Sequence, residues 1–331
     1  MRLMAEQGIG GEVAENFSHA PVLLGAVLEA LLLDVDENVS SEQQVVVDAT
    51  FGAGGYSRAI LEKTNYRVVA IDRDANVIAR ADALAALYPD RFRFVHACFA
   101  DMETALTPAE KSQLQAVVMD LGVSSMQLDD PLRGFSFRAD GPLDMRMGLG
   151  ADSAADLVNG LEEEELANII YEFGEEKKSR RVARAIVAAR PITHTLQLAE
   201  IVRKAVGHSP KMAIDPATRT FQALRIAANG ELAQLENGLA VAGDLLTKGG
   251  RLIVVSFHSL EDRMVKNYFK EHQGGHKGSN RHLPVMLTAS DGVDLSEFRV
   301  VHKKVVIADD NETSSNPRAR SARLRAGIKQ N

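Results

Sequence analysis

The chain has 331 residues, of which 45% are hydrophobic, and its formal net charge is −7 at pH 7. This length allows one large domain or two ordinary domains, and the acidic balance does not favour a general nucleic-acid binder. A single cysteine, Cys98, excludes an internal disulfide and agrees with a reducing compartment. With no signal peptide and no apolar run of membrane length, we expect a cytoplasmic protein with a flexible N-terminus over residues 1–16.

The first elements in chain order are an apolar helix, expected from about Val22, and a buried strand. Three consecutive valines at 45–47 are typical of such a strand, and a loop with Gly52, Gly54 and Gly55 follows it. Glycines let the backbone adopt positive φ and approach a ligand closely. The sequence therefore predicts a strand, a glycine-rich turn and a helix, with a ligand at the turn.

The segment after the turn carries an acid at the distance that ribose binding requires. Ser57 is expected to cap a helix over 58–63, and a second strand over 67–71 ends in Asp72. An acid about 20 residues beyond a glycine turn is placed to accept hydrogen bonds from a ribose. These signals predict a nucleotide-like cofactor; a plain tight turn between strand and helix is the structural alternative.

Glycine spacing and a nearby acid distinguish two cofactors. The dinucleotide fingerprint G-x-G-x-x-G, counted from Gly52, needs a glycine where Ser57 stands. Asp48, at the start of the loop, would repel a pyrophosphate but suits the cationic sulfonium and ammonium groups of S-adenosylmethionine. We therefore predict S-adenosylmethionine rather than a nicotinamide dinucleotide.

Two further strands complete the expected sheet. A helix over 74–87 leads to a strand over 91–96, which ends near Phe99, and a strand over 115–120 ends in Asp120. Strands that alternate with helical crossovers predict a parallel, doubly wound, Rossmann-like α/β sheet. Cofactors bind at the carboxyl ends of such strands, where Asp48, Asp72, Phe99 and Asp120 fall.

A long interval before the next strand predicts an inserted helical unit. The strand expected over 251–257 lies about 130 residues after the fourth, whereas a crossover needs only one helix. Residues 153–206 show several short helical patterns, the first with a capping box, and a helix over 218–246 returns to the sheet. An edge strand region is expected over 298–308.

Two stretches collect basic residues although the chain is acidic. Residues 177–190 contain six cationic residues and no acid, and residues 316–331 contain five and no acid. Such patches can contact phosphates. The alternative for 177–190 is a solvated helix face, whereas the tail shows no apolar face to solubilise.

Motifs spread from residue 19 to residue 325 occur together in one known family. They are His19-Ala-Pro-Val-Leu-Leu, Asp48-Ala-Thr-Phe-Gly-Ala-Gly-Gly, Ala70-Ile-Asp-Arg-Asp, Asp120-Leu-Gly-Val-Ser-Ser, Arg133-Gly-Phe-Ser-Phe, Gly141-Pro-Leu-Asp-Met-Arg-Met, Arg219-Thr-Phe-Gln-Ala-Leu-Arg-Ile, Val255-Ser-Phe-His-Ser-Leu-Glu-Asp-Arg and Asn316-Pro-Arg-Ala-Arg-Ser-Ala-Arg-Leu-Arg. In these, and over nearly the whole chain, the sequence resembles the bacterial 16S rRNA (cytosine-N4)-methyltransferases of the MraW/RsmH type.

The resemblance implies a class I S-adenosylmethionine-dependent methyltransferase fold with a helical domain inserted after the fourth strand. It also implies methylation of the N4 amine of a cytidine in the decoding centre of 16S rRNA, within the small ribosomal subunit. From the residues we expect no membrane segment and no metal, and a homodimer is left open. We accordingly divide the chain beyond residue 16 into a first methyltransferase part over 17–130, an inserted substrate-recognition domain over 131–217, a second methyltransferase part over 218–315 and a basic tail over 316–331.

The resemblance also assigns cofactor contacts, and two positions depart from the family pattern. Tyr56 stands where the family has histidine, and it can still present backbone groups to the methionine part of the cofactor. Met126 stands where the family has proline, an exchange expected to loosen the loop that carries Gln127. The implied cofactor-binding residues are Gly54, Gly55, Tyr56, Asp72 on the ribose, Phe99 near the adenine, Asp120 and Gln127.

Catalysis requires in-line positioning of the methyl donor and an acceptor for the N4 hydrogens. Asp120, or a main-chain carbonyl of Leu121 or Gly122, is the candidate acceptor; contact of Asp120 with the cofactor alone is the alternative. The target base must also leave its stack. Candidates to line its pocket, each of which has a structural role as its alternative, are Arg133, Phe135, Phe137, Asp144, Arg146, Arg219, Gln222, Arg225, His258 and Ser259.

Other classes of protein are weighed against this one. A carbon-5 cytosine methyltransferase needs a nucleophilic cysteine beside a proline, and Cys98 lacks that context, so it is expected to be a buried structural thiol. No metal-ligand spacing appears. Methylation of another RNA or DNA amino group, and a non-catalytic assembly factor on the same fold, remain as alternatives. The presence of Asp72 and Asp120 favours an enzyme.

Overall fold

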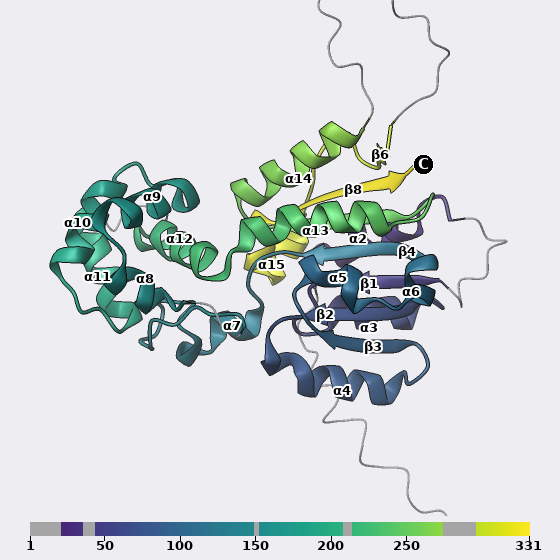
Figure 1. Ribbon diagram of the computed structural model, residues 1–331, viewed down its shortest axis with the longest axis horizontal. Coiled ribbons are helices and arrows are strands. Elements are labelled where there is room, and N and C mark those ends of the chain that lie inside the picture. Colours follow the sequence, from purple (N-terminus) through teal and green to yellow (C-terminus); the bar gives the residue numbers. More distant parts are fainter. Residues whose placement is uncertain (1–20, 36–43, 149–151, 208–213, 274–295) are drawn as a thin grey trace, which may run out of the picture. The chain divides into compact units, whose positions relative to one another are not determined.

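The computed structural model describes residues 21–35, 44–148, 152–207, 214–273 and 296–331. These residues divide into two compact units, the first within 1–72, 76–121 and 235–331, the second within 73–75 and 122–234 (Figure 1). The second unit is wider at both ends than the insert predicted over 131–217. At its C-terminal end this is because the helix that begins at Ala217 packs against the helix over 163–174.

One eight-stranded sheet forms the centre of the first unit. Its strands are β1 (Val45–Asp48), β2 (Arg67–Asp72), β3 (Phe92–His96), β4 (Leu114–Asp120), β5 (Arg251–Ser256), β6 (Phe298–Val300), β7 (Val306–Ile307) and β8 (Arg323–Lys329). They follow the order β3-β2-β1-β4-β5-β8-β6, and β7 pairs with β8. The first five in this order are parallel, which confirms the predicted doubly wound sheet.

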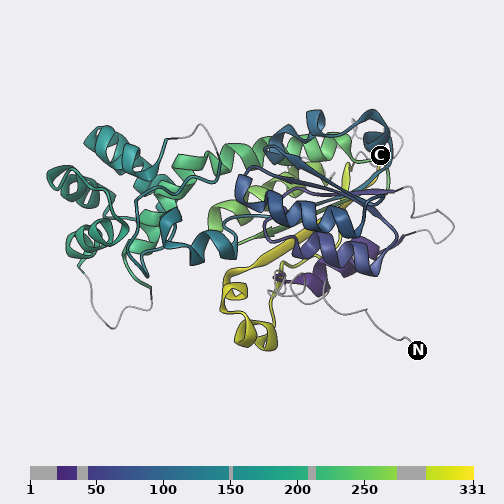
Figure 2. The same ribbon diagram turned by 90° about the horizontal axis from the view of Figure 1, so that it is seen from below.

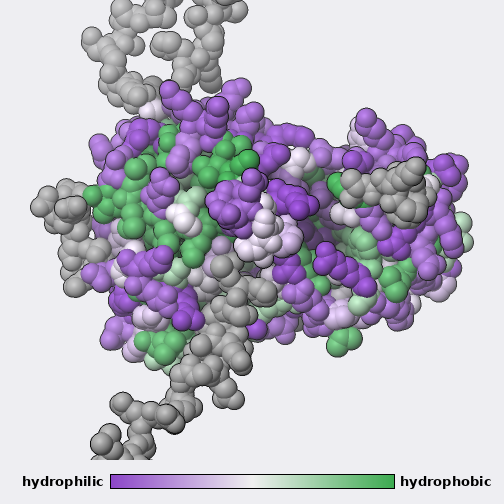
Figure 3. All heavy atoms as spheres, turned by 180° about the vertical axis from the view of Figure 1, so that it is seen from behind, coloured by the Kyte–Doolittle hydropathy of each residue, from purple (hydrophilic) through white to green (hydrophobic). Residues whose placement is uncertain are grey.

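Helices cover both faces of this sheet (Figures 1 and 2). The helices of the first unit are α2 (Leu24–Leu32), α3 (Gly55–Lys63), α4 (Ile78–Leu87), α5 (Met102–Ala105), α6 (Pro108–Ser112), most of α13 (Glu231–Leu245), α14 (Ser259–His272) and α15 (Asp310–Ser315). Leu239 of α13 and Phe269 of α14 share a buried cluster with Val254 of β5. On the opposite face, α2 packs against β5 and α3 against β2. Figure 3 shows hydrophobic side chains gathered over part of this unit's surface.

The C-terminal basic segment is part of the sheet, so its prediction as a tail without an apolar face is wrong. Strand β8 pairs with β5 at six positions and buries Leu324 and Ile328. Arg323 and Arg325 instead reach Asp262, at nitrogen–oxygen distances of 2.9 and 2.7 Å. Basic and apolar residues alternate here with the two-residue period of a strand. The prediction rested on the number of basic residues in this segment and did not consider their spacing.

The second unit is helical, as the interval between strands predicts. Its helices are α7 (Ser125–Asp129), α8 (Ala154–Gly160), α9 (Glu163–Gly174), α10 (Ser179–Ala188), α11 (Thr195–Val206) and α12 (Ala217–Asn229). The predicted capping box at α8 is present, since the hydroxyl of Ser153 accepts the N–H of Asp156. The single helix predicted over 218–246 is wrong: it is broken at Gly230, whose φ of 58° ends α12. Among the described residues, no helix is long and apolar enough to cross a bilayer.

Candidate functional site

The glycine-rich turn joins β1 to α3 in the first unit. Gly52 and Gly54 adopt φ of 52° and 80°, a region that other residues rarely enter, so the turn depends on them. Helix α3 begins at Gly55, with Gly54 at its N-cap. The expectation that Ser57 caps the helix is therefore wrong. Ser57 lies inside the first turn of α3 and has another partner.

That partner is Asp48, which is completely buried at the end of β1. Its carboxylate accepts the hydroxyl of Ser57 at 2.6 Å, the N–H of Ser57 at 3.1 Å and the N–H of Thr50 at 3.3 Å. Burial raises the pKa of Asp48 to about 6, although the hydrogen bonds from Ser57 and Thr50 oppose the rise. Asp48 thus fixes the shape of the turn, and its effect on a cofactor stays a prediction.

Asp72 closes the other side of the turn. It ends β2, and its Oδ2 accepts the N–H of Gly52 at 2.7 Å. The side chain stays partly exposed, as a ligand contact requires. Phe99 follows β3 and lies against α13 at Gly238, where a Cβ would overlap the phenyl ring. The strand ends thus carry the residues predicted there; their contacts with ribose and adenine stay predictions.

Asp120 ends β4, and its main chain is bound to the same turn. Its N–H donates to the hydroxyl of Thr50 at 2.6 Å. Its Oδ1 is buried and has no hydrogen-bond partner among the residues that the structure describes. Burial, and next the charges of Asp48 and Glu261, raise the pKa of Asp120 well above its ordinary value. A buried acceptor without a partner is the kind of group that a ligand satisfies.

Tyr56 holds the segment before α2 against the turn. Its side chain is buried, and its hydroxyl donates to the carbonyl of Val22. Pro21 lies so close to Gly55 that a Cβ there would overlap the proline ring. The N–H of Leu23 donates in turn to Glu312 at 2.5 Å. Tyr56 therefore has a structural contact through its hydroxyl, and its backbone contact with a cofactor stays a prediction.

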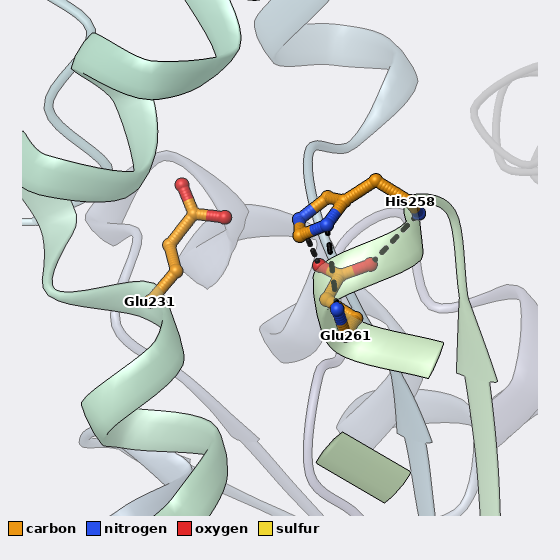
Figure 4. A group of neighbouring side chains, drawn as sticks. All are labelled: Glu231, His258 and Glu261. Carbon is orange, nitrogen blue, oxygen red and sulfur yellow. Dashed lines mark hydrogen bonds and ion pairs between the residues drawn. The ribbon is translucent and has the colours of Figure 1, made fainter. Parts of the chain in front are cut away.

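His258 and Ser259 lie where β5 gives way to α14. His258 is the N-cap of α14, and its Nδ1 accepts the N–H of Glu261 at 3.4 Å. Glu261 is buried, receives the N–H groups of Phe257 and His258, and lies 3.1 Å from the Nε2 of His258 (Figure 4). Glu231, also drawn there, belongs to the second unit. Sequence reasoning missed Glu261, although His258 and Glu261 have the spacing of a capping box.

Gln127 lies in the second unit, inside α7. It forms a capping box with Ser124 and donates its amide to Asp74 at 2.8 Å. Asp74 also pairs with Arg133, at 2.9 Å. Gln127 is thus held in a capped helix next to Met126, and this is not the loosened loop that the exchange to methionine predicts.

The remaining predicted substrate residues of the second unit have partners within it. Arg146 forms two bonds to Asp144, and these bonds lower the pKa of Asp144. On α12, Arg219 lies 3.6 Å from Glu176, Gln222 donates to the carbonyl of Phe173, and Arg225 forms two bonds to Glu231. Phe135 and Phe137 belong to or pack on the core. Each of these side chains therefore has a contact within the unit, and their roles toward a substrate stay predictions, as does the absence of a metal.

A doubly wound sheet, a glycine-rich turn after β1 and acids at the ends of β2 and β4 define a Rossmann-like methyltransferase of class I. The chain matches the MraW methylase family over residues 16–330 and belongs to that family. The predicted family and the predicted cofactor, S-adenosylmethionine, are thereby confirmed.

Curated relatives support the same assignment. Each of the following three carries the name ribosomal RNA small subunit methyltransferase H. The chain is 50% identical to the one from Rhodospirillum rubrum, covering 93% of this chain and 93% of that one. It is 51% identical to the one from Methylorubrum populi (95% and 88%) and 52% identical to the one from Methylobacterium sp. strain 4-46 (93% and 90%). A solved rRNA methylase from Streptococcus thermophilus matches with a TM-score of 0.41 at 9% identity, over 95% of this chain and 100% of that one, which is too weak to support a conclusion.

Proposed function

We propose that this protein transfers the methyl group of S-adenosylmethionine to the N4 amine of a cytidine in the decoding centre of 16S rRNA. Family membership and relatives named as small-subunit rRNA methyltransferases support the reaction class and the RNA. The cytidine and its position are what the resemblance of these motifs to the cytosine-N4 methyltransferases implies. A ribosomal subunit as substrate implies that the reaction takes place in the cytoplasm.

The observation that carries the proposal is the unpaired carboxyl oxygen of Asp120. The cofactor supplies an electrophilic methyl group, so the enzyme has to orient the amine and accept its hydrogens. The lone pair of N4 is delocalised into the cytosine ring, and an acceptor aligned with an N–H localises it. Asp120 Oδ1 is an acceptor that has no partner in the described structure. A bound cation near the strand ends would lower the pKa of Asp120 again and favour the accepting carboxylate.

A main-chain carbonyl is the alternative acceptor. The N–H of Leu121 donates to the carbonyl of Val255 at 2.9 Å, so the chain after β4 is fixed in place. The carbonyl of Leu121 or of Gly122 could receive the amine while Asp120 contacts the cofactor alone. Both versions use the same strand end and differ in whether the carboxylate is needed for turnover.

Methyl transfer to small ribosomal subunits tests the proposal. Subunits from cells that lack the enzyme are incubated with labelled S-adenosylmethionine, with already methylated subunits as the control. We expect label in the 16S rRNA of the first sample and none in the second. Label on neither sample, despite measurable cofactor binding, would contradict the proposed substrate and favour a different nucleic acid or a non-catalytic role.

A further inference from the structure

Helix α10 of the second unit has two faces of opposite character. Val182, Ala183 and Ile186 are completely buried among the helices of that unit. The helix carries no acid, and its other face exposes arginines. A basic run of this kind is often only a solvated face, so the contacts of each cation decide between the two cases.

Some basic residues of this region serve the fold. The ammonium group of Lys178 donates to the carbonyl of Val206 at 2.7 Å. Arg190 donates to the carbonyls of Val158 and Leu161 at 2.6 and 2.5 Å. The contacts of Lys178 and Arg190 with main-chain carbonyls therefore explain why these two cations are present.

Four cations remain on the exposed face, and we call them the arginine face: Lys177, Arg180, Arg181 and Arg184. Lys177, Arg180 and Arg181 make no side-chain hydrogen bond or ion pair within the described parts of the chain. Arg184 lies 3.4 Å from Glu163, with 76% and 43% of the two side chains exposed. Exposed pairs of this kind contribute little to stability, roughly 0–1 kcal/mol. The arginine face is therefore not explained by the fold.

Spacing places the three arginines on one side of α10. Lys177 lies in the turn that precedes the helix, and Arg180, Arg181 and Arg184 fall within roughly 100° of one another around the helix axis, because each residue advances by about 100°. With a rise of about 1.5 Å per residue, Arg180 and Arg184 are roughly 6 Å apart along the axis. Three exposed guanidinium groups so close together repel one another and attract a polyanion. The planar guanidinium also matches phosphate, because it can donate two parallel hydrogen bonds.

We propose that the arginine face binds phosphates of the RNA substrate. An RNA is favoured over an acidic protein surface because α10 itself carries three exposed arginines and no acid, and because a chain of net charge −7 needs a local cationic surface to approach a polyanion. The proposal rests on the proposed function only in that the substrate is an RNA. It assigns to α10 a positioning contact that is independent of base identity.

The salt dependence of binding tests this proposal with the full-length protein. Affinity for naked 16S rRNA and for small subunits is measured at several salt concentrations for Arg180→Gln, Arg181→Gln and the double variant. Lys204→Gln is the matched control, since Lys204 is an exposed cation of the same unit that lies 3.9 Å from Glu200. The affinity falls as salt rises, and each α10 substitution should make this fall less steep, by about 0.7–0.9 in the slope of log affinity against log salt. Cofactor affinity and thermal stability should not change.

The outcomes separate this proposal from the proposed function. If the α10 variants keep the wild-type salt dependence, or if their salt dependence changes no more than that of Lys204→Gln, the arginine face does not bind RNA. A loss seen with subunits but not with naked rRNA would also overturn the proposal and identify a protein partner. Wild-type methyl transfer is measured alongside. Absence of transfer would count against the proposed function, whereas the binding slopes would still decide the role of α10.

Discussion

Four buried or partly buried carboxyl groups of the first unit contribute to the charge of the candidate site, and they belong to Asp48, Asp72, Asp120 and Glu261. Asp48 and Asp120 have raised pKa values, first because they are buried and then because they interact with neighbouring acids, among them Asp72 and Glu261. Ionised acids in a poorly solvated site repel one another, and a bound cation relieves that repulsion. The charge of the site therefore favours a cationic cofactor, as the position of Asp48 predicts.

Asp120→Asn tests the role of the carboxylate. We expect turnover to fall by about 100-fold or more, because the amide is a weaker acceptor and cannot take up charge. Affinity for S-adenosylmethionine, measured by calorimetry, should change much less. Asp101→Asn, an exposed acid of the same unit, is the control. Retention of both turnover and affinity in Asp120→Asn would exclude the carboxylate and leave the main-chain carbonyls.

Asp48 should make stability depend on pH. Its pKa is about 6 in the fold and 3.8 in the unfolded chain, so between these values the folded protein holds a proton that the unfolded chain has lost. The free energy of unfolding should therefore decrease as pH rises from about 4 to 6, by at most roughly 3 kcal/mol. Asp48→Asn should remove this part of the slope in denaturant titrations. An unchanged slope would show that Asp48 titrates normally.

Tyr56→Phe removes the donor to the buried carbonyl of Val22. We expect the free energy of unfolding to fall by about 1–3 kcal/mol, because a buried acceptor then lacks its partner. Tyr171→Phe, at an exposed position, should leave stability unchanged. If the two variants unfold at the same denaturant concentration, the hydroxyl of Tyr56 does not hold the segment before α2.

Sequence predicts the strand-end residues well and their partners poorly. Asp72 and Asp120 could be placed because each follows an apolar run that has to be a buried strand. The bond between Ser57 and Asp48 depends on how the glycine-rich turn folds back on β1, and the capping box of Glu261 and His258 has a histidine where such boxes usually have serine or threonine. Local capping rules assigned Ser57 to the helix terminus, and a tertiary contact determined its actual role.

At the scale of elements, β8 is the main difference between expectation and structure. An arginine-rich segment was expected to be a tail, yet it lies between β5 and β6. Helices with regular apolar spacing, such as α9 and α11, could be predicted because one face alone shows the pattern. The break at Gly230 could not, since a glycine inside a helical pattern is often tolerated.

Leu324→Ala tests whether β8 is an integral strand. Leu324 is completely buried, so the substitution should lower the free energy of unfolding by about 2–5 kcal/mol. Arg320→Ala, at an exposed position before the strand, should change it by less than about 0.5 kcal/mol. Equal stability of the two variants in chemical denaturation would contradict the pairing of β8 with the rest of the sheet.

At the scale of the whole molecule, the chain combines a methyltransferase sheet with a helical unit inserted into it. The first unit holds the glycine turn and the acids at the strand ends, and the second carries Gln127, the candidate substrate residues on α12 and the arginine face on α10. Cofactor chemistry and RNA binding are thus assigned largely to different units. Substitutions in α10 should therefore change RNA affinity without changing cofactor affinity.

Identification of the methylated nucleoside tests whether this protein methylates the N4 amine of a cytidine in 16S rRNA. Small subunits from cells that lack the enzyme are methylated with labelled S-adenosylmethionine, and the 16S rRNA is digested to nucleosides and separated. We expect the label in N4-methylcytidine, and we expect fragment mapping to place it in the decoding centre. Label in 5-methylcytidine, in a methylated adenosine, or at a cytidine elsewhere in the rRNA would contradict this expectation.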